Sequence, residues 1–400
     1  MGRHIYVHNP FCVRKCPYCD FFSVTDRTKA QAYYEAAVRE TRFWADYDKK
    51  HAEPVNDGPD TIYFGGGTPS CVPEKLICDL LEAVTGSFGT GSDAEITLEV
   101  NPASFTAEKG KAYLEAGFNR ISMGIQSLDD RILKTLGRLH DSEGALRALD
   151  SAFEAGFTNI SADLITGVPG QETEGVLNDL QTLIQKGVKH ISTYSLMIEE
   201  NTPFYSRYKD NIEELMPPET EREMYHAVRH CLEQNGIIPY EISNSAVKGF
   251  ESRHNTAYWE GRDYYAIGAG AHGFLDSVRF SHYEDIDLYI KAMDSLKPEE
   301  VLSLLKTGEE GTGSVEGFIY CEERLSLNDR MREYPFLKLR TTMGIDTCGF
   351  KTRFGKDFRT IYAEELQSNV RKGFLKDDGR YVSLTEKGLD FANLVMEDFL

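Results

Sequence analysis

Short runs of apolar and β-branched residues recur along the first half of the chain, and stretches with helical spacing separate them. Three of these stretches, residues 28–44, 106–116 and 172–186, carry helix formers, and the last two stop at a glycine. Strands that alternate with helices of this length pair in parallel as βα units. The sequence therefore predicts an α/β fold in which six βα units form an open, partial (β/α)6 barrel. The six predicted strands are residues 4–8, 61–64, 95–100, 120–125, 160–165 and 191–196.

The alternation of strand-like and helix-like segments changes after about residue 235, and this change predicts a division of the chain there. Residues 1–235 form the predicted barrel, residues 236–300 extend it and link it onward, and residues 301–400 form a small, mainly helical C-terminal domain. One further strand is predicted at residues 237–242. A stretch rich in Gly and Glu at residues 307–317 is typical of a mobile loop or linker.

The end of the predicted C-terminal domain has the outline of a winged helix, because a hairpin-like turn at residues 373–384 precedes a final helix. Residues 370–400 contain five Lys or Arg and six Asp or Glu. A wing that binds DNA needs a basic surface, which this balance does not provide. We therefore expect a packing module that caps the barrel.

Composition excludes several classes of protein. The chain has 400 residues and a net charge of −20, which argues against nonspecific binding to nucleic acids or anionic membranes. No segment approaches the about 20 consecutive apolar residues of a membrane span. The short run after Arg3 does not resemble a signal peptide, and the eight cysteines suggest free thiols. We expect a cytoplasmic protein.

Three cysteines, Cys12, Cys16 and Cys19, stand in the spacing CxxxCxxC directly after the first predicted strand. Pro10 and Pro17 favour a loop over a helix here. Three thiolates can hold three irons of a four-iron cluster and leave the fourth iron open for a ligand. A zinc site remains an alternative with His8 as a fourth ligand, although structural zinc is usually bound by two pairs of ligands. The other cysteines show no metal-ligand spacing and are expected to be buried thiols: Cys71, Cys78, Cys231, Cys321 and Cys348.

Distinctive polar residues follow the next predicted strands, where active sites of parallel folds lie. Gly66, Gly67 and Thr68 belong to a triple-glycine segment that could bring backbone amides close to a ligand or form an ordinary turn. Glu99 ends the third strand and either binds a ligand or faces solvent. Gln126 interrupts an apolar run, so its amide needs a partner in a cofactor or in the backbone.

Two further charged residues belong to the same region. Asp163 near the end of the fifth strand could bind ribose hydroxyls or cap a loop, and Arg138 follows the fourth strand. Residues 268–273 match GxGxxG literally, but a dinucleotide fingerprint needs a helix directly afterwards. Residues 274–282 look extended instead, so we expect a tight glycine-rich crossing without NAD. We expect His272 within it to be packed in the core, with a second ligand as the alternative.

The cysteine spacing, with aromatic Tyr18 before the last cysteine, resembles the signature of the radical S-adenosylmethionine (radical SAM) proteins. This resemblance implies one [4Fe-4S] cluster on the three cysteines, with SAM chelating the fourth iron. It further implies that an electron from the cluster splits SAM and yields a 5′-deoxyadenosyl radical. The protein would hold the sulfonium against the cluster and exclude water.

Over nearly the whole chain, the segments together resemble the oxygen-independent coproporphyrinogen III oxidase-like family of radical SAM proteins. The resemblance implies that Tyr6, Gly66 and Glu99 contact the cluster-bound SAM. It also implies a second nucleotide pocket with Tyr18 at its edge. That pocket would be lined by Gly67, Thr68, Gln126, Arg138 and Asp163.

Two departures from the oxidase resemble a sister branch of heme chaperones. Phe21 stands where the oxidase has a fourth cysteine, and only eleven residues precede Cys12, where the oxidase has a long extension. Residues 254–259 also fit the HNxxYW motif that is associated with heme in that branch, which makes His254 a candidate heme contact, with a surface histidine as the alternative. The chaperone reading implies heme or a porphyrin as cargo, heme-receiving proteins, and an electron donor such as a flavodoxin or a ferredoxin. Oxidative decarboxylation of coproporphyrinogen III is the alternative, and a radical methyltransferase or porphyrin-opening enzyme ranks below both.

Overall fold

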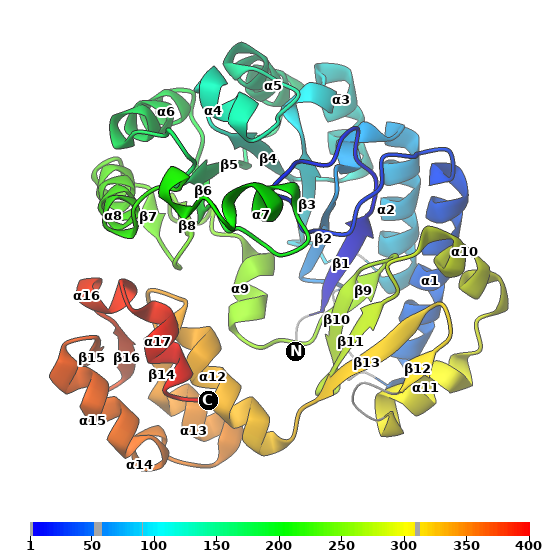
Figure 1. Ribbon diagram of the computed structural model, residues 1–400. Coiled ribbons are helices and arrows are strands. Elements are labelled where there is room, and N and C mark those ends of the chain that lie inside the picture. The colour runs from blue at the N-terminus through cyan, green and yellow to red at the C-terminus, as the bar shows by residue number, and fades with distance from the viewer. Residues whose placement is uncertain (1–2, 52–57, 90, 309–312) are drawn as a thin grey trace.

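A curved sheet of nine strands forms the main body of the protein (Figure 1). The computed structural model describes residues 3–51, 58–89, 91–308 and 313–400. The strand order is β7-β8-β6-β5-β4-β3-β2-β1-β9, in which β1 to β6 are parallel and β9 pairs in parallel with β1. Helices α1 to α6 and α8 lie on the outer side of the sheet. The α/β fold class and the partial barrel of six βα units are confirmed.

The strands of this sheet agree with the predicted ones to within two residues for β1 to β6. The strands are β1 (His4–Asn9), β2 (Thr61–Gly66), β3 (Glu95–Val100), β4 (Arg120–Gln126), β5 (Ile160–Thr166), β6 (His190–Ser195), β7 (Ile238–Pro239), β8 (Asn244–Ala246) and β9 (Tyr265–Ile267). The predicted strand at 237–242 is mostly wrong, because only Ile238 and Pro239 form a strand, antiparallel to β8, and Glu241 makes an isolated antiparallel bridge to Thr341.

The helices of the barrel follow the predicted pattern. Their bounds are α1 (Ala30–His51), α2 (Glu74–Phe88), α3 (Ala107–Ala116), α4 (Asp130–Thr135), α5 (Ser142–Ala155), α6 (Thr173–Gln185), α7 (Pro203–Tyr208), α8 (Pro218–Gln234) and α9 (Arg253–Trp259). The predicted helix at 106–116 is α3, in which the Thr106 hydroxyl accepts a hydrogen bond from the Lys109 amide. Gly117 ends it in the left-handed conformation.

A second, antiparallel sheet covers the β9 side of the barrel and was not predicted from the sequence. It consists of β10 (His272–Leu275), β11 (Val278–His282), β13 (Ile319–Arg324) and β12 (Ser314–Val315), with α10 (Ile286–Ser295) and α11 (Pro298–Thr307) inserted. The extended character of residues 274–282 is confirmed. The expectation that His272 is packed in the core is wrong, because its side chain is 59% exposed. Residues 309–312 of the predicted loop lie outside the described residues.

The predicted domain boundary at residue 300 is not where the structure divides. β13 pairs with β11, and buried Val301, Phe318 and Ile319 belong to the main hydrophobic core. A separate core starts only at Met331 and extends to Phe399. The C-terminal unit therefore begins at α12, because pairing of β13 in the second sheet ties the preceding segment to the barrel.

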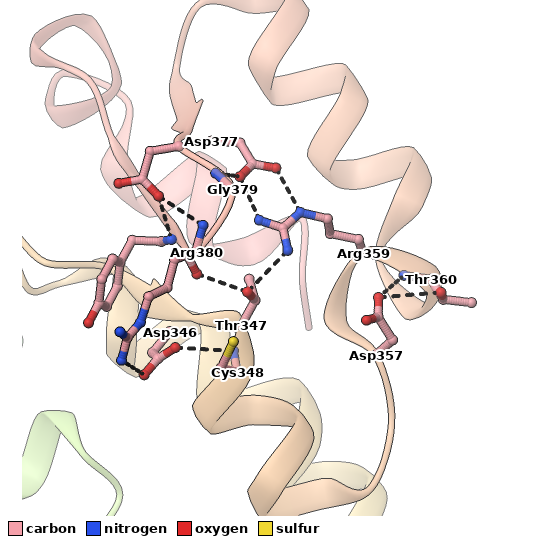
Figure 2. A network of polar contacts seen from close by, with 11 residues as sticks. Asp346, Thr347, Cys348, Asp357, Arg359, Thr360, Asp377, Gly379 and Arg380 are labelled. Atoms are coloured by element: carbon pink, nitrogen blue, oxygen red, sulfur yellow. Dashed lines mark hydrogen bonds and ion pairs between the residues drawn. The ribbon is translucent and has the colours of Figure 1, made fainter.

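The C-terminal unit combines helices with a small sheet, as the winged-helix outline suggests. Its elements are α12 (Leu327–Leu339), β14 (Ile345–Asp346), α13 (Thr347–Phe354), α14 (Phe358–Ile361), α15 (Ala363–Lys372), β15 (Leu375–Asp377), β16 (Tyr381–Leu384), α16 (Glu386–Leu389) and α17 (Ala392–Glu397). Figure 2 shows how Arg359 fixes the β15–β16 hairpin: its guanidinium donates to both oxygens of Asp377, at 2.6 and 2.9 Å, and to the Thr347 hydroxyl at 3.1 Å. The hairpin is thereby held against α13 and α14.

One buried carboxylate joins the barrel to the second sheet. Glu40 on α1 is fully buried and accepts hydrogen bonds from His282 Nε2 at 2.6 Å, the Tyr289 hydroxyl at 2.6 Å and the Trp44 indole at 2.9 Å. Its second oxygen also accepts from the Gly268 amide at 2.8 Å. These bonds tie β11, α10 and the glycine-rich crossing to a single side chain of α1. Gly268 has φ of +105°, and a Cβ there would collide with the Tyr33 hydroxyl, which explains the glycine.

We expect Glu40→Ala to lower the free energy of unfolding by about 3–5 kcal/mol, because several buried donors lose their acceptor at once. Urea unfolding followed by circular dichroism measures this change. Glu35→Ala is the matched control, since Glu35 is an exposed carboxylate on the same helix. A loss for Glu40→Ala no larger than that for Glu35→Ala would contradict the assigned role.

Candidate functional site

The cysteine loop leaves the carboxyl end of β1 and is held by backbone bonds at both of its ends. The Cys12 amide donates to the Val24 carbonyl at 2.9 Å, and the Val24 amide donates to the Pro10 carbonyl at 2.7 Å. Cys12 is buried and Cys16 and Cys19 are half-buried, all three as free thiols. Burial raises the pKa of the Cys12 and Cys19 thiols. The predicted loop brings three thiols to one edge of the sheet.

The zinc alternative requires a fourth ligand beside the three thiols. Across the described part of the chain, no three His, Cys, Asp or Glu side chains converge closely enough to hold one metal ion. Cysteines of a four-iron cluster each bind a separate iron and need no common point, whereas structural zinc gathers four ligands around itself. His8, the fourth ligand of the zinc alternative, has both ring nitrogens engaged elsewhere.

His8 anchors the cysteine loop to the barrel, a role that the sequence does not reveal. Its Nε2 donates to the Phe22 carbonyl at 2.9 Å, and its Nδ1 accepts from the Tyr6 hydroxyl at 3.0 Å. The imidazole is buried, which lowers its pKa to about 4 and keeps it neutral. Phe22 follows Cys19 closely, so this bond helps to position the end of the loop.

The triple-glycine segment after β2 lies directly against the cysteine loop. The Gly67 amide donates to the Asn9 carbonyl and the Thr68 amide to the Phe11 carbonyl, both at 2.7 Å. A Cβ on Gly67 would lie 2.7 Å from the Phe11 carbonyl oxygen and 3.2 Å from Cys12 Sγ. The Thr68 hydroxyl is 3.4 Å from the same sulfur. The glycine is required because the two backbones approach closely.

Glu99 lies at the end of β3, where its carboxylate is half-buried and hydrogen-bonded. One carboxylate oxygen accepts from the Tyr63 hydroxyl at 2.7 Å and the other from the Gly66 amide at 3.2 Å. Burial raises the pKa of Glu99 to about 7, against the effect of these bonds. Tyr6 stacks on Tyr63, with ring centroids 6.3 Å apart. The residues expected around the cluster-bound SAM are therefore neighbours.

Arg138 joins the cysteine loop to the region expected to form the second pocket. Its Nη1 lies 3.5 Å from Cys16 Sγ and 3.4 Å from the Tyr18 hydroxyl, and its Nη2 donates to the Gly124 carbonyl at 2.8 Å. Its buried Nε has no hydrogen-bond partner among the described residues. An unpaired buried donor of this kind fits a ligand with an acceptor group.

Gln126 and Asp163 occupy neighbouring strands of the same edge. Gln126 has φ of +69°, a conformation that is uncommon for residues other than glycine, at an irregularity in the pairing of β4 with β5. Asp163 accepts from the hydroxyls of Ser122 at 2.9 Å, Ser161 at 3.0 Å and Ser192 at 2.8 Å. Burial raises its pKa. The carboxylate is held in place by neutral hydroxyl donors, and no cation among the described residues forms an ion pair with it.

His254 lies at the opposite end of the barrel from the cysteines. It is buried on α9, and its ring nitrogens hydrogen-bond the Thr61 hydroxyl at 2.7 Å and the Tyr258 hydroxyl at 2.8 Å. The carboxylate of Glu95 accepts from the amides of Arg253 and His254, each at 3.0 Å. Thr61 and Glu95 are the first residues of β2 and β3, so α9 closes the amino end of the strands.

The position of His254 bears on its predicted role. It is not the surface histidine of the alternative reading, because only 1% of the residue is exposed. Burial lowers its pKa well below the usual value. A heme iron would have to displace the hydrogen bond to Thr61 or to Tyr258 to reach a ring nitrogen. Contact between His254 and heme stays a prediction.

The barrel, its thiol loop and the adjoining glycine segment define a radical SAM protein. Residues 6–183 match the Radical SAM superfamily, and residues 325–391 match the HemN C-terminal domain. The chain is 32% identical to the heme chaperone HemW of Lactococcus lactis over 99% of this chain and 96% of that protein. It is also 32% identical to HemW of Bacillus subtilis over 99% and 98%. The chain belongs to the HemW family.

The fold agrees with a solved relative outside that family. The structure of coproporphyrinogen III oxidase (HemN) from Escherichia coli superposes with a TM-score of 0.80 over 100% of this chain and 90% of that chain, at 21% identity. At this identity the likeness concerns the fold alone. The predicted radical SAM class and the predicted branch are confirmed.

Within the described ranges, none of the helices combines the length and the apolar character needed to cross a membrane.

We expect Gly67→Ala to lower the iron and sulfide content of the reconstituted protein, because the added methyl group pushes the cysteine loop away from β2. Gly86→Ala is the matched control, since a Cβ at that helical position meets no atom within 4 Å. Iron and sulfide analysis, with circular dichroism as a check of folding, measures the effect. Equal cluster content in both variants would contradict the close approach.

The raised pKa of Glu99 predicts a pH-dependent stability. Its pKa is about 7 in the folded protein against 4.5 as its ordinary value, so the folded state binds more protons between these values. The free energy of unfolding of the parent, relative to Glu99→Gln, therefore falls as pH rises from about 4.5 through 7. Denaturant unfolding of both proteins without SAM at several pH values measures the difference. A difference that is constant across this range would contradict the assignment.

Proposed function

We propose that this protein is a heme chaperone, which binds heme and delivers it to other proteins. The observation that carries the proposal is similarity over the full length to proteins named heme chaperone HemW, with 96% and 98% of those two relatives covered. Phe21, where the oxidase pattern has a fourth cysteine, supports it, since this side chain is 66% exposed beside the cysteine loop. We propose the cytoplasm as its location.

Within this proposal, the cluster is held by Cys12, Cys16 and Cys19, and SAM lies beside it at the carboxyl ends of the strands. When the cluster and SAM are bound, the cluster would supply the electron that cleaves the sulfonium of SAM. Glu99 offers acceptors for the amino group of SAM. The unpaired Nε of Arg138 and the fixed carboxylate of Asp163 suit the polar groups of a second nucleotide. The remaining partners are heme-receiving proteins and an electron donor, such as a flavodoxin or a ferredoxin.

The alternative, oxidative decarboxylation of coproporphyrinogen III, is not favoured by any particular observation. The likeness to the oxidase concerns the fold. A shared fold does not by itself imply the oxidase reaction, because unrelated functions share folds. The thiol loop of this chain has Phe21 at the position that distinguishes the oxidase pattern.

Two anaerobic measurements on the cluster-reconstituted protein test the proposal. Hemin titration, followed by transfer to an apo-hemoprotein, measures binding and delivery. Incubation with SAM, a reductant and coproporphyrinogen III, with products weighed by mass spectrometry, measures decarboxylation. We expect stoichiometric hemin binding with transfer and no loss of carboxyl groups. Loss of two carboxyl groups, or no binding of hemin, would contradict the proposal.

A further inference from the structure

A cavity of about 390 Å³ lies between helix α8 and the C-terminal unit. It is bounded by α8 and the segment after β7 on the barrel side, and by the end of α12, the β15–β16 hairpin and α16 on the other side (Figure 1). Its volume falls within the range of small-molecule sites in proteins. It shares no residue with the cysteine loop or the glycine segment, so it is a separate site.

The cavity combines an apolar lining with cationic side chains. Ile242, Leu339, Leu384 and Leu389 provide aliphatic surface, and Arg229, Arg340 and Lys376 provide positive charge. Three carboxylates, Glu233, Glu241 and Glu386, also contribute to the lining. An apolar body that carries more than one carboxylate matches this combination of groups.

Several buried polar atoms of the cavity residues lack partners. Arg229 Nη1, Arg340 Nε and Glu241 Oε2 have no hydrogen-bond partner within the described parts of the chain. Only 1% of Glu241 is exposed, and its other carboxylate oxygen accepts from the Asn244 amide. Buried donors and acceptors are normally paired, so an unpaired set around one cavity indicates a ligand with polar groups of its own. A ligand carboxylate would satisfy the two guanidinium donors.

Two imidazoles line the same cavity from one face of α8. His226 Nε2 is 2.7 Å from the Asp390 carboxylate, to which it donates, so this nitrogen is occupied. His230, one turn later, is exposed, and its Nε2 accepts from the Gln234 side-chain amide at 2.8 Å. The exposed amide can rotate away at little cost. His230 therefore has the nitrogen that is available to a metal.

We propose that this cavity binds heme, with His230 Nε2 as an axial ligand of the iron, the propionates on Arg229 and Arg340, and the macrocycle against the aliphatic side chains. This assignment rests on the proposed heme chaperone function and gives the cargo a place remote from the cluster. Neutral imidazole is a common heme ligand, and guanidinium groups bind carboxylates with two parallel hydrogen bonds. Lys376 on the exposed hairpin provides a further cation at the rim.

The position of Arg340 connects the HNxxYW motif to this cavity. The Arg340 guanidinium lies over the ring of Trp259, 4.5 Å from its centroid. Trp259 is the last residue of α9, whose first turn contains His254. The motif therefore orients a propionate-binding arginine, and it affects heme without providing the iron ligand. Trp259 is a positioning residue in this arrangement.

A second cavity offers a rival place for heme. It has about 260 Å³, lies between α1 and the α10–α11 pair, and contains Arg39, Lys50 and His51 beside Phe43 and Tyr47. It is smaller, and Arg39 is already paired with Asp294 at 2.9 Å. His51 is an exposed imidazole on a different face of the molecule. It therefore serves as the matched control for His230.

Anaerobic hemin titration of the cluster-loaded full-length protein tests the proposal, with magnetic circular dichroism of the ferric heme as the readout of iron ligation. We expect His230→Ala to remove the histidine-ligated signature and to raise the hemin Kd by at least about tenfold. We expect Arg340→Gln and Trp259→Leu to raise the Kd about three- to tenfold while the ligation signature stays. His51→Ala leaves both quantities at the parent values.

The outcomes separate this inference from the function on which it rests. Failure of the parent protein to bind hemin overturns the proposed function itself. Parent-like binding by His230→Ala, with an intact parent signature, overturns the cavity and leaves the chaperone function standing. Loss of the histidine-ligated heme signature in His51→Ala also overturns the placement of heme in this cavity. Its loss in His254→Gln with unchanged cluster content does the same. His230 is exposed, so its variant folds, and cluster content and circular dichroism verify this for every protein.

Discussion

The close approach of two backbone segments, the cysteine loop and the triple-glycine segment, is the constraint on which the candidate site depends. The parallel register of β1 and β2 places Asn9 opposite Gly66, and the next two amides of the glycine segment donate to carbonyls of the loop. Any side chain at Gly67 would occupy the space of those carbonyls. Further bonds from His8 and Arg138 then hold the loop from both sides. The thiols are thus positioned by backbone geometry.

The two ends of the barrel carry different kinds of side chain. The carboxyl ends of the strands hold thiols, Glu99, Arg138 and Asp163, which suit a charged cofactor. The amino ends are closed by α9, where Glu95 and Thr61 pair with the helix and its histidine. From there, Trp259 contacts Arg340 and so connects the barrel to the C-terminal unit. A heme site beside that unit would keep the cargo away from reactive chemistry at the mouth, because the whole length of the strands lies between them.

Much of the architecture could be predicted because the strands of a parallel sheet are buried on both faces and give a strong local signal. The cysteines stand out by their CxxxCxxC spacing, and Glu99, Gln126 and Asp163 are candidates because polar residues at strand ends interrupt that signal. The short antiparallel strands β10 to β13 gave no such signal, and the turn at Asp276 and Ser277 uses positive φ at two residues that are not glycine. Exposed His272 and the true start of the C-terminal unit were missed for the same reason.

The sequence alone determined the class of protein, since the cysteine spacing with Tyr18 resembles the radical SAM signature and the alternation of strands and helices is a local pattern. Tertiary structure alone decided which nitrogens are free and which are engaged. His8, His230 and His254 look alike as letters in a chain, yet one holds a loop, one lines a cavity with an accessible nitrogen, and one is buried between two hydroxyls. Each role depends either on hydrogen-bond partners that are distant in sequence or on the solvent exposure of the side chain. Both are properties of the packed chain.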